Sequence, residues 1–314
     1  MPDVAANPQT TRHVLMIRPR HFGVNPQTAA SNVFQHRAPA GDNLAARAAA
    51  EVDAVAARLV AEGLTPLVFD DTAAPPKPDA VFPSNWVSFH TDGRAVLYPM
   101  QAANRRAERR PELLEVLAKR GYALHDTVDL SHFEATGGAL EGTGSLVLDR
   151  PRRRAFAALS SRTQAPVLAE FARRTGYRLQ AFATEYRGHP VYHTNVMLAL
   201  GRQFAVVCDE VIVDPNERQT LLAQLTASAR DIIRIDAEQM AHFAANLLEL
   251  DADGGPVIAM STTALNAFRP AQRQSLEAHG RLLAVPLPAV EIGGGSLRCM
   301  LAEVFLPRAT RAGG

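Results

Sequence analysis

Short apolar runs and amphipathic stretches alternate along the chain, and together they predict a mixed α/β protein. The first apolar run, HVLMIRP, ends at Pro19 and predicts a buried strand. An alanine-rich stretch from about Leu44 to Glu62 predicts a helix that ends at Gly63, a residue type common just past helix C-termini. The run TPLVFD that follows predicts a second strand.

Pairs of short strands then alternate with helices up to the C-terminus. The strand pairs are AVFPSNWVSFH with RAVLYPM, GSLVLD with RAFAALS, VYHTNVMLALG with QFAVVCDEVI, and RLLAVPLP with SLRCMLAEVFLP. DIIRID and PVIAM are further strands, and the predicted helices cover residues 111–119, 165–175, 217–227, the stretch AEQMAHFAANLLEL, and 271–278. The recurring unit is two strands, a helix and another strand, repeated about every sixty residues. No interdomain linker interrupts it, so we expect one domain over residues 11–308, with flexible tails at 1–10 and 309–314.

The amino-acid composition argues against several classes of protein. The 314 residues include 33 basic and 32 acidic side chains, a balance that argues against a general nucleic-acid or anionic-membrane surface. No apolar run reaches the roughly 18 residues of a membrane helix, and the first residues lack the pattern of a secretory signal. Two cysteines give neither a disulfide framework nor a cysteine-based metal site. These features predict a soluble, cytoplasmic protein.

One of the two cysteines, Cys299, follows three glycines in EIGGGSLRCM. A lone buried cysteine is more often a small hydrophobic side chain than a nucleophile. The glycine run favours a pocket, because glycine permits a close approach of the backbone to a ligand. Cys208, within QFAVVCDEV, continues a strand core and is interpreted as structural.

A thiol nucleophile needs partners that move protons and orient it. His193 and Asn195, two residues apart in a predicted strand, would lie on one face of that strand. Glu141 stands between apolar residues and a glycine turn in GGALEGTGSLVLD, where a buried carboxylate must be paired or protonated. The segment FPSNW, from Phe82 to Trp86, suits a pocket wall, although such aromatic residues are also common in cores.

Taken together, EGTGS, HTN and GGGSLRCM resemble, in this order and at these separations, the guanidino-group-modifying superfamily. That superfamily includes arginine deiminases, dimethylarginine hydrolases and glycine amidinotransferases. The chain is most similar to the citrulline utilization (CtlX-type) amidinotransferase branch, from MIRPRHFGVN to VFLP. The resemblance implies a five-bladed, pseudo-symmetric α/β propeller (pentein) of ββαβ units. It implies an amino-acid substrate and no metal or organic cofactor, and it leaves a homo-oligomer open.

The resemblance also implies catalytic roles. Cys299 would be the nucleophile, His193 the general acid and base, and Glu141 the carboxylate that orients His193 or holds substrate nitrogens. Phe82 would form an apolar wall against the planar head group.

Two further parts of the site follow from the resemblance. Arg162 in LSSRT matches the arginine that grips the substrate carboxylate, and an arginine of NRRAE is expected to assist. We assign that second role to Arg106, with Arg105 as the alternative. The loop near Phe22–Gln35, rich in turn-forming residues, matches a mobile lid.

Three departures from the superfamily pattern change the expected substrate. Arginine-processing relatives carry FxRD, HxD and EGGD where this chain has FPSN, HTN and EGTG, so Asn85, Asn195 and Gly144 stand in place of carboxylates. An amide loses the charge-assisted bond to guanidinium, at roughly 3–5 kcal/mol per desolvated pair. A ureido group is neutral and offers both N–H donors and a carbonyl acceptor, which amides can satisfy. We therefore expect L-citrulline as substrate, with ornithine, ammonia and carbon dioxide as products.

Alternatives remain open from the sequence. A transferase would pass an amidino or carbamoyl group to an amine in place of water. An arginine or methylarginine deiminase-type hydrolase would act on a guanidino group. A non-catalytic pentein-fold binding protein is the alternative from another class, although it has no need of Cys299, His193 and Glu141 together.

Overall fold

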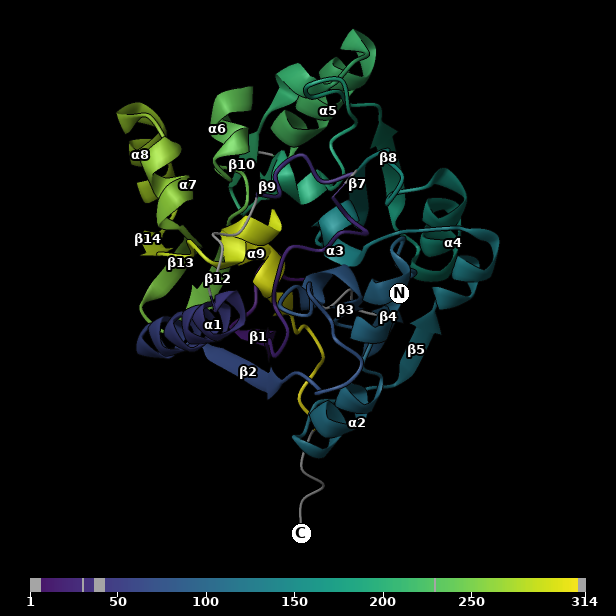
Figure 1. Cartoon of the computed structure of the whole chain (residues 1–314). Helices are drawn as coiled ribbons and strands as arrows, with labels where there is room; N and C mark the ends of the chain where they lie inside the picture. Colours follow the sequence, from purple (N-terminus) through teal and green to yellow (C-terminus); the bar gives the residue numbers. More distant parts are fainter. Residues whose placement is uncertain (1–6, 30, 37–42, 229, 310–314) are drawn as a thin grey trace.

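The computed structural model describes residues 7–29, 31–36, 43–228 and 230–309, which form five small sheets of three strands each (Figure 1). The sheets have the strand orders β15-β1-β2, β3-β4-β5, β6-β7-β8, β9-β10-β11 and β12-β13-β14. In each sheet the first pair is antiparallel and the second pair is parallel. The mixed α/β class predicted from the sequence is confirmed.

The elements have the following bounds. The strands are β1 (His13–Arg18), β2 (Thr65–Asp70), β3 (Val87–Phe89), β4 (Arg94–Leu97), β5 (Asp126–Asp129), β6 (Val147–Asp149), β7 (Arg154–Ala158), β8 (Arg178–Phe182), β9 (Leu198–Leu200), β10 (Phe204–Val207), β11 (Asp231–Arg234), β12 (Leu248–Ala252), β13 (Gly255–Ser261), β14 (Arg281–Val285) and β15 (Ala302–Glu303). The α-helices are α1 (Leu44–Ala61), α2 (Glu112–Lys119), α3 (Gly142–Ser145), α4 (Ala165–Thr175), α5 (Pro215–Ala227), α6 (Ala237–Ala241), α7 (Thr262–Ala267), α8 (Pro270–Glu277) and α9 (Leu297–Met300). The 3-10 turns are η1 (Pro83–Asn85), η2 (Ala103–Glu108), η3 (Ser131–Thr136), η4 (Thr194–Val196), η5 (Asp209–Val211) and η6 (Val290–Gly293).

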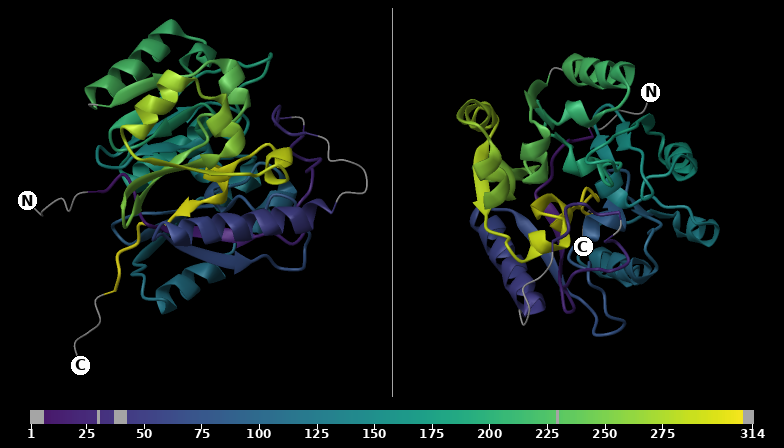
Figure 2. Two further views of the ribbon diagram at one scale, coloured as in Figure 1. Left: turned by 90° about the vertical axis from the view of Figure 1, so that its left-hand side faces the viewer. Right: turned by 45° about the horizontal axis from the view of Figure 1, so that its top comes forward.

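Every sheet has a helical connection between its two parallel strands. Parallel neighbours cannot be joined by a tight hairpin, so each such pair needs a crossover. The crossovers are α1, α2, α4, α5 and the pair α7 with α8. Figure 2 shows the sheets as blades around a centre, with these helices on the outside. This is the predicted five-bladed α/β propeller of ββαβ units.

The two ends of the chain close the ring. Strand β15 pairs antiparallel with β1 through Val14↔Glu303 and Leu15↔Ala302, so the last strand completes the first blade. Among the described residues, no helix is both long and apolar enough to cross a membrane.

Helix α1 shows how the sequence builds the outer layer. Val52 and Leu59, seven residues apart, belong to one apolar face that is buried against β1 and β2. The Asn43 side chain caps the first turn, and Gly63 adopts a φ of 76° just past the last turn. Each fully buried valine or leucine contributes roughly 1.5–3 kcal/mol to this packing.

Short helical turns replace the beginnings of four predicted strands. Residues 83–85, 142–145, 194–196 and 297–300 are η1, α3, η4 and α9, and regular pairing of β3, β6, β9 and β15 begins only afterwards. The prediction that His193 and Asn195 share one face of a strand is therefore wrong. Apolar neighbours gave these segments a strand-like composition, but tertiary packing at the centre of the ring determines their backbone.

The end of AEQMAHFAANLLEL is also different from the prediction. Helix α6 ends at Ala241, and Leu248 to Ala252 form β12, which pairs antiparallel with β13. Leu248 and Leu250 point into one core cluster, while Glu249 between them bonds Arg202. This period of two is that of a strand.

The N-terminal tail, expected to cover residues 1–10, is shorter in the part of the chain that the structure describes. Residues 1–6 and 310–314 lie outside the described residues, but Gln9 and Thr10 are buried. The Gln9 side chain donates to Leu148 O (2.9 Å) and accepts from Arg150 N (3.1 Å) at the end of β6. The packed domain therefore begins before residue 11.

We expect Gln9→Ala to lower the free energy of unfolding by about 1–3 kcal/mol, because it removes the amide that pairs a buried N–H and a buried carbonyl. Urea unfolding of the full chain measures this. The exposed Gln274→Ala is the control and should change stability by less than about 0.5 kcal/mol. Equal effects of the two substitutions would mean that the segment around Gln9 is not an integral part of the fold.

Candidate active site

The turns that precede the first strand of each blade meet at the centre of the ring. Turn η1 packs against α3 and α9, and α3 also packs against η4. A fifth turn, residues 242–247 before β12, reaches the same place through a bond to the α9 cysteine. Together these turns bring five polar side chains into one buried cluster: Asn85, Glu141, His193, Asn246 and Cys299.

Cys299 lies on α9 and is 3% exposed. Its Sγ accepts from the side-chain amides of Asn246 (3.3 Å) and Asn195 (3.5 Å). Its backbone carbonyl accepts from Ser84 Oγ (2.8 Å), which ties α9 to η1. Cys208, by contrast, is buried in an apolar cluster, and burial raises the pKa of its thiol to about 12, as suits a structural residue.

His193 and Glu141 form the predicted pair. His193 Nε2 lies 2.8 Å from Glu141 Oε2. Burial alone would raise the pKa of Glu141, but Arg162, Arg105 and His193 outweigh it and hold that pKa well below its usual range. Because an ionised carboxylate can only accept, Nε2 carries the proton and Nδ1 is left to accept one. Burial lowers the pKa of His193 to about 4, and Glu141 offsets this only in part.

Arg105 is the most highly connected cation of the site. Its guanidinium donates to both oxygens of Glu108 (2.9 Å each), to Glu141 Oε2 (3.1 Å) and to Asn85 Oδ1 (3.0 Å). Asp79 Oδ2 lies 3.4 Å from its Nε. Burial alone would lower the pKa of Arg105, but these carboxylates reverse the effect and raise it. The guanidinium is therefore permanently charged and almost completely paired.

Arg162 and Arg106 lie in different surroundings. Arg162 is buried over the Tyr192 ring, bonds Ser31 Oγ (2.8 Å) and Thr28 O (3.3 Å), and lies 3.6 Å from Glu141. The guanidinium of Arg106 bonds Met100 O and approaches Glu134, away from this cluster. Of the two arginines considered in NRRAE, the structure therefore brings Arg105 into the site and leaves Arg106 outside it.

The amide of Asn85 has a fixed orientation. Its Oδ1 accepts from Arg105, so a flipped amide would place two donors against each other. Its Nδ2 is buried and has no hydrogen-bond partner among the described residues. A Cβ on Gly144 would lie 2.5 Å from this Nδ2 and 2.8 Å from His193 Nδ1. No side chain fits at position 144, which explains structurally why a third carboxylate is absent there.

Asn195 has an unpaired acceptor, whereas Asn85 has an unpaired donor. Its Nδ2 donates to Cys299 Sγ, whereas its buried Oδ1 has no partner among the described residues. The site thus presents one unpaired donor, on Asn85, and one unpaired acceptor, on Asn195. Unpaired buried polar atoms are rare in folded proteins and commonly mark a place for a ligand or water.

A narrow cavity lies in front of Cys299. It is lined by Asn32, Asp79, Phe82, Asn85, Arg105, Arg162, Tyr192, His193, Gly293, Gly294, Gly295 and Cys299. Phe82 forms one apolar wall, and a Cβ on Gly295 would lie 2.8 Å from its ring. The glycine run therefore lets the backbone pass directly against Phe82.

The described residues of the loop from Phe22 to Gln35 lie against this cavity. Phe22 packs edge-on against Phe82, with ring centroids 6.4 Å apart, and Asn32 Nδ2 donates to Gly293 O. Through Ser31 and Thr28 the loop also contacts Arg162. It lies where a lid was predicted, and the prediction that it moves stays open.

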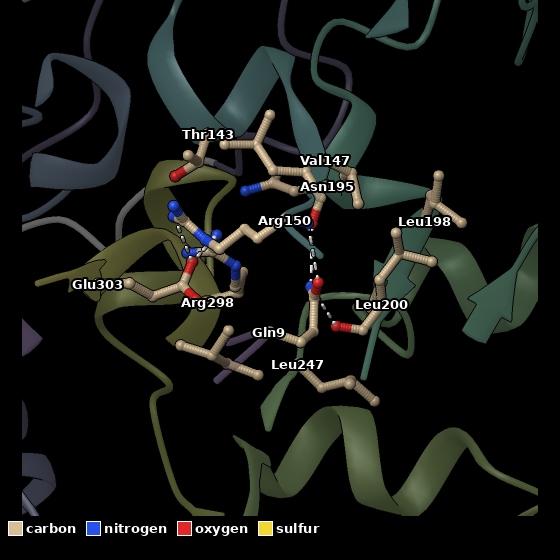
Figure 3. A pocket seen from close by; sticks show the side chains of 13 residues that line it. Gln9, Thr143, Val147, Arg150, Asn195, Leu198, Leu200, Leu247, Arg298 and Glu303 are labelled. Carbon is tan, nitrogen blue, oxygen red and sulfur yellow. Dashed lines mark hydrogen bonds and ion pairs between the residues drawn. The ribbon is translucent and has the colours of Figure 1, made fainter. Parts of the chain in front are cut away.

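Asn195 lines a second cavity (Figure 3). Gln9, Arg150, Arg298 and Glu303 supply most of its polar lining, and Glu303 accepts from Arg298 (2.9 Å). Asn195 lines this cavity and not the one in front of Cys299.

Several site residues were not predicted from the sequence: Asp79, Glu108, Tyr192 and Asn246. Asn246 had a detectable signal, because it precedes its strand by two residues, as Asn85 does. The others contact the site only through tertiary packing. Within the described residues, no group of three or more histidine, cysteine or acidic side chains could hold a metal ion.

Comparison with known proteins agrees with this geometry. A sequence model of eukaryotic N,N-dimethylarginine dimethylhydrolases matches residues 18–306. The solved N-terminal domain of ArgZ, a cyanobacterial arginine dihydrolase of the ornithine–ammonia cycle, bound to its substrate, has 16% identity and a TM-score of 0.72, over 93% of this chain and 97% of that chain. A dimethylarginine dimethylaminohydrolase adduct with S-methyl-L-thiocitrulline has 16% identity and a TM-score of 0.64, over 94% and 100%. Unliganded AgrE has 18% identity and a TM-score of 0.69, over 95% of this chain and 40% of that chain.

The curated protein sequences gave no match. At these low identities the solved structures establish the fold alone, and the narrower resemblance to the citrulline utilization branch stays a prediction. The family match, however, extends over most of the chain. The chain therefore belongs to the N,N-dimethylarginine dimethylhydrolase family, within the guanidino-group-modifying superfamily of enzymes that act on C–N bonds.

Proposed function

We propose that the protein is a cysteine-dependent hydrolase that cleaves the ureido group of L-citrulline to give ornithine, ammonia and carbon dioxide. The observation that carries the proposal is the buried, unpaired Nδ2 of Asn85, a residue that lines the cavity in front of Cys299. Its orientation is set by Arg105, so it offers a donor to the ligand. A guanidinium has no acceptor for that donor, whereas a ureido carbonyl does.

The carboxylates of the site support a neutral head group as well. Glu141 Oε2 already accepts from His193 and Arg105, and its Oε1 accepts from Gln101 N (3.2 Å). Both oxygens of Glu108 are held by Arg105. Few lone pairs therefore remain for a substrate cation, and removing a carboxylate from these protein cations would leave them unpaired in a buried site.

The proposed chemistry uses Cys299, His193 and Asn85, which line the same cavity. Cys299 loses its proton to His193 Nδ1, and its sulfur attacks the ureido carbon to form a C–S bond. His193 then protonates the ornithine nitrogen as the C–N bond breaks, leaving an S-carbamoyl cysteine. Water activated by His193 cleaves the C–S bond and releases carbamic acid, which decomposes to ammonia and carbon dioxide. The Asn85 amide donates to the carbonyl oxygen as negative charge develops on it.

Recognition of the amino-acid end needs a cation that lines the cavity. Arg162 is the candidate for the substrate carboxylate, because it pairs with Glu141 only at 3.6 Å and its hydrogen-bond partners are neutral oxygens of the covering loop. A carboxylate would replace them with a charge-assisted, two-pronged interaction. Phe82 would pack against the planar ureido group.

The second candidate is a guanidino substrate, arginine or an N-methylated arginine. It is favoured by the family match and by Asp79, which lines the cavity and whose Oδ1 has no hydrogen bond among the described residues. Transfer of a carbamoyl or amidino group to an amine shares the first half of the reaction. Product analysis distinguishes these reactions.

The substrate assay tests the proposal directly. We expect purified protein to convert citrulline to ornithine and ammonia in equal amounts, and Cys299→Ala to abolish the reaction because no nucleophile remains. Cys208→Ala is the matched control and should retain activity. Efficient formation of citrulline from arginine or N,N-dimethylarginine, without ornithine, would instead establish the guanidino alternative.

Exchange of the amide at position 85 tests specificity. Asn85→Asp restores a carboxylate and removes the N–H donor, so the ratio of kcat/KM for citrulline to that for arginine should fall by about 100-fold or more. Steady-state assays with both substrates measure the ratio. Asn216→Asp, an exposed change on α5, should leave it unaltered. An unchanged ratio in Asn85→Asp would show that this amide does not contact the head group.

The pH dependence tests the role of His193. A pKa of about 4 keeps His193 neutral, and able to accept the thiol proton, well below neutral pH. Its contribution to kcat/KM should therefore be lost only as the pH falls through about 4. Between pH 7 and about pH 5.5 we expect a change of less than about twofold, whereas an ordinary histidine would produce about a tenfold loss. Rates measured in that range, with folding checked by circular dichroism, distinguish the two.

A further inference from the structure

The sulfur of Cys299 has an unusual set of neighbours for a catalytic thiol. Within the described residues, its hydrogen-bond partners are the two amides of Asn246 (3.3 Å) and Asn195 (3.5 Å). His193 forms its bond with Glu141 and none with Sγ. The groups that hold the sulfur are therefore neutral donors and not a cation.

The orientation of the Asn246 amide is fixed by the backbone of α9. Its Oδ1 accepts from Arg298 N (3.0 Å), next to Cys299, so its Nδ2 must face the sulfur. Asn246 is 1% exposed, and Nδ2 also lies 3.4 Å from Asn195 O. A flipped amide would oppose the Arg298 N–H with a second donor and would lose both contacts.

The side chain of Arg298 further restrains the turn that carries Cys299. Its guanidinium bonds Leu301 O (3.0 Å) and Glu303 (2.9 Å), as Figure 3 shows for the Glu303 contact. The turn that carries Cys299 is thus anchored to β15, and Asn246 meets a rigid partner. Two contacts therefore set the distance between the amide and the sulfur. One is the bond of the amide oxygen to Arg298 N, and the other is the attachment of α9 to β15.

We propose that Asn246 is a catalytic residue that, together with Asn195, stabilises the thiolate form of Cys299. The inference rests on the proposed function only in taking Cys299 as the nucleophile. When the thiol proton moves to His193 Nδ1, negative charge appears on a sulfur that is shielded from water, and two N–H donors offset its loss of hydration. The same donors hold the sulfur again when the C–S bond of the intermediate breaks and its electron pair returns.

Asn246→Asp separates this role from a structural one. The carboxylate keeps the shape of the side chain and an oxygen for Arg298 N, but it replaces the N–H donor with an acceptor that repels a thiolate. We expect the apparent pKa of Cys299, measured from the pH dependence of iodoacetamide alkylation, to rise by one unit or more. The value of kcat/KM should fall by about 100-fold or more, as when an oxyanion donor is removed.

Three companion proteins complete the experiment. Asn246→Ala removes the donor without adding charge and should shift alkylation in the same direction by a smaller amount, which keeps the test valid if the aspartate variant does not fold. Asn216→Asp on the exposed face of α5 should behave as wild type. Cys299→Ala gives the alkylation background from Cys208.

Alkylation needs no substrate, so its outcome is independent of the identity of the substrate. A raised thiol pKa in a protein that does not act on citrulline would support the role of Asn246 and contradict the citrulline proposal. Alkylation profiles of folded Asn246→Asp and Asn246→Ala that match wild type would overturn the inference about Asn246.

Discussion

The buried guanidinium of Arg105 is the interaction on which the rest of the site depends. It joins η2 to η1 and α3, because Glu108, Asn85 and Glu141 lie on or beside these three segments. Leaving such a charge unpaired in the protein interior would cost several kcal/mol, so each partner is held in place strongly. Together with Arg162, the guanidinium keeps Glu141 ionised, and through Glu141 it sets the tautomer of His193. It also fixes the direction of the Asn85 amide.

The complete ring of blades stabilises short central turns that a single ββαβ unit could not hold. Turns such as η1, η4 and α9 are three or four residues long, too short to be stable alone. They persist because each is followed by a paired strand and packs against its neighbours at the centre. The pairing of β15 with β1 then matters beyond stability, since it holds the segment that carries Cys299 against η1.

The sequence predicted the outer helices better than the short turns at the centre of the ring. Helices α1, α4 and α5 follow from apolar spacing and end signals, which are local. Cys299, His193 and Glu141 stand beside glycine turns or in short motifs, so they could be singled out and matched to a superfamily. The turns around them could not be predicted, because their apolar neighbours favour strands and only tertiary packing decides otherwise. Asp79 and Glu108 escaped notice for a similar reason: their role is to pair with Arg105, which the sequence did not separate from Arg106.

The charge of Arg162 connects the covering loop with the pair of Glu141 and His193. Arg162 lies between the loop oxygens of Ser31 and Thr28 and the carboxylate of Glu141. In the proposed function, a substrate carboxylate on Arg162 would weaken the pull of this cation on Glu141. Glu141 would then interact more strongly with His193, which would become a better acceptor for the thiol proton. Binding of the substrate carboxylate and the reactivity of the cysteine would therefore be coupled through Arg162 and Glu141.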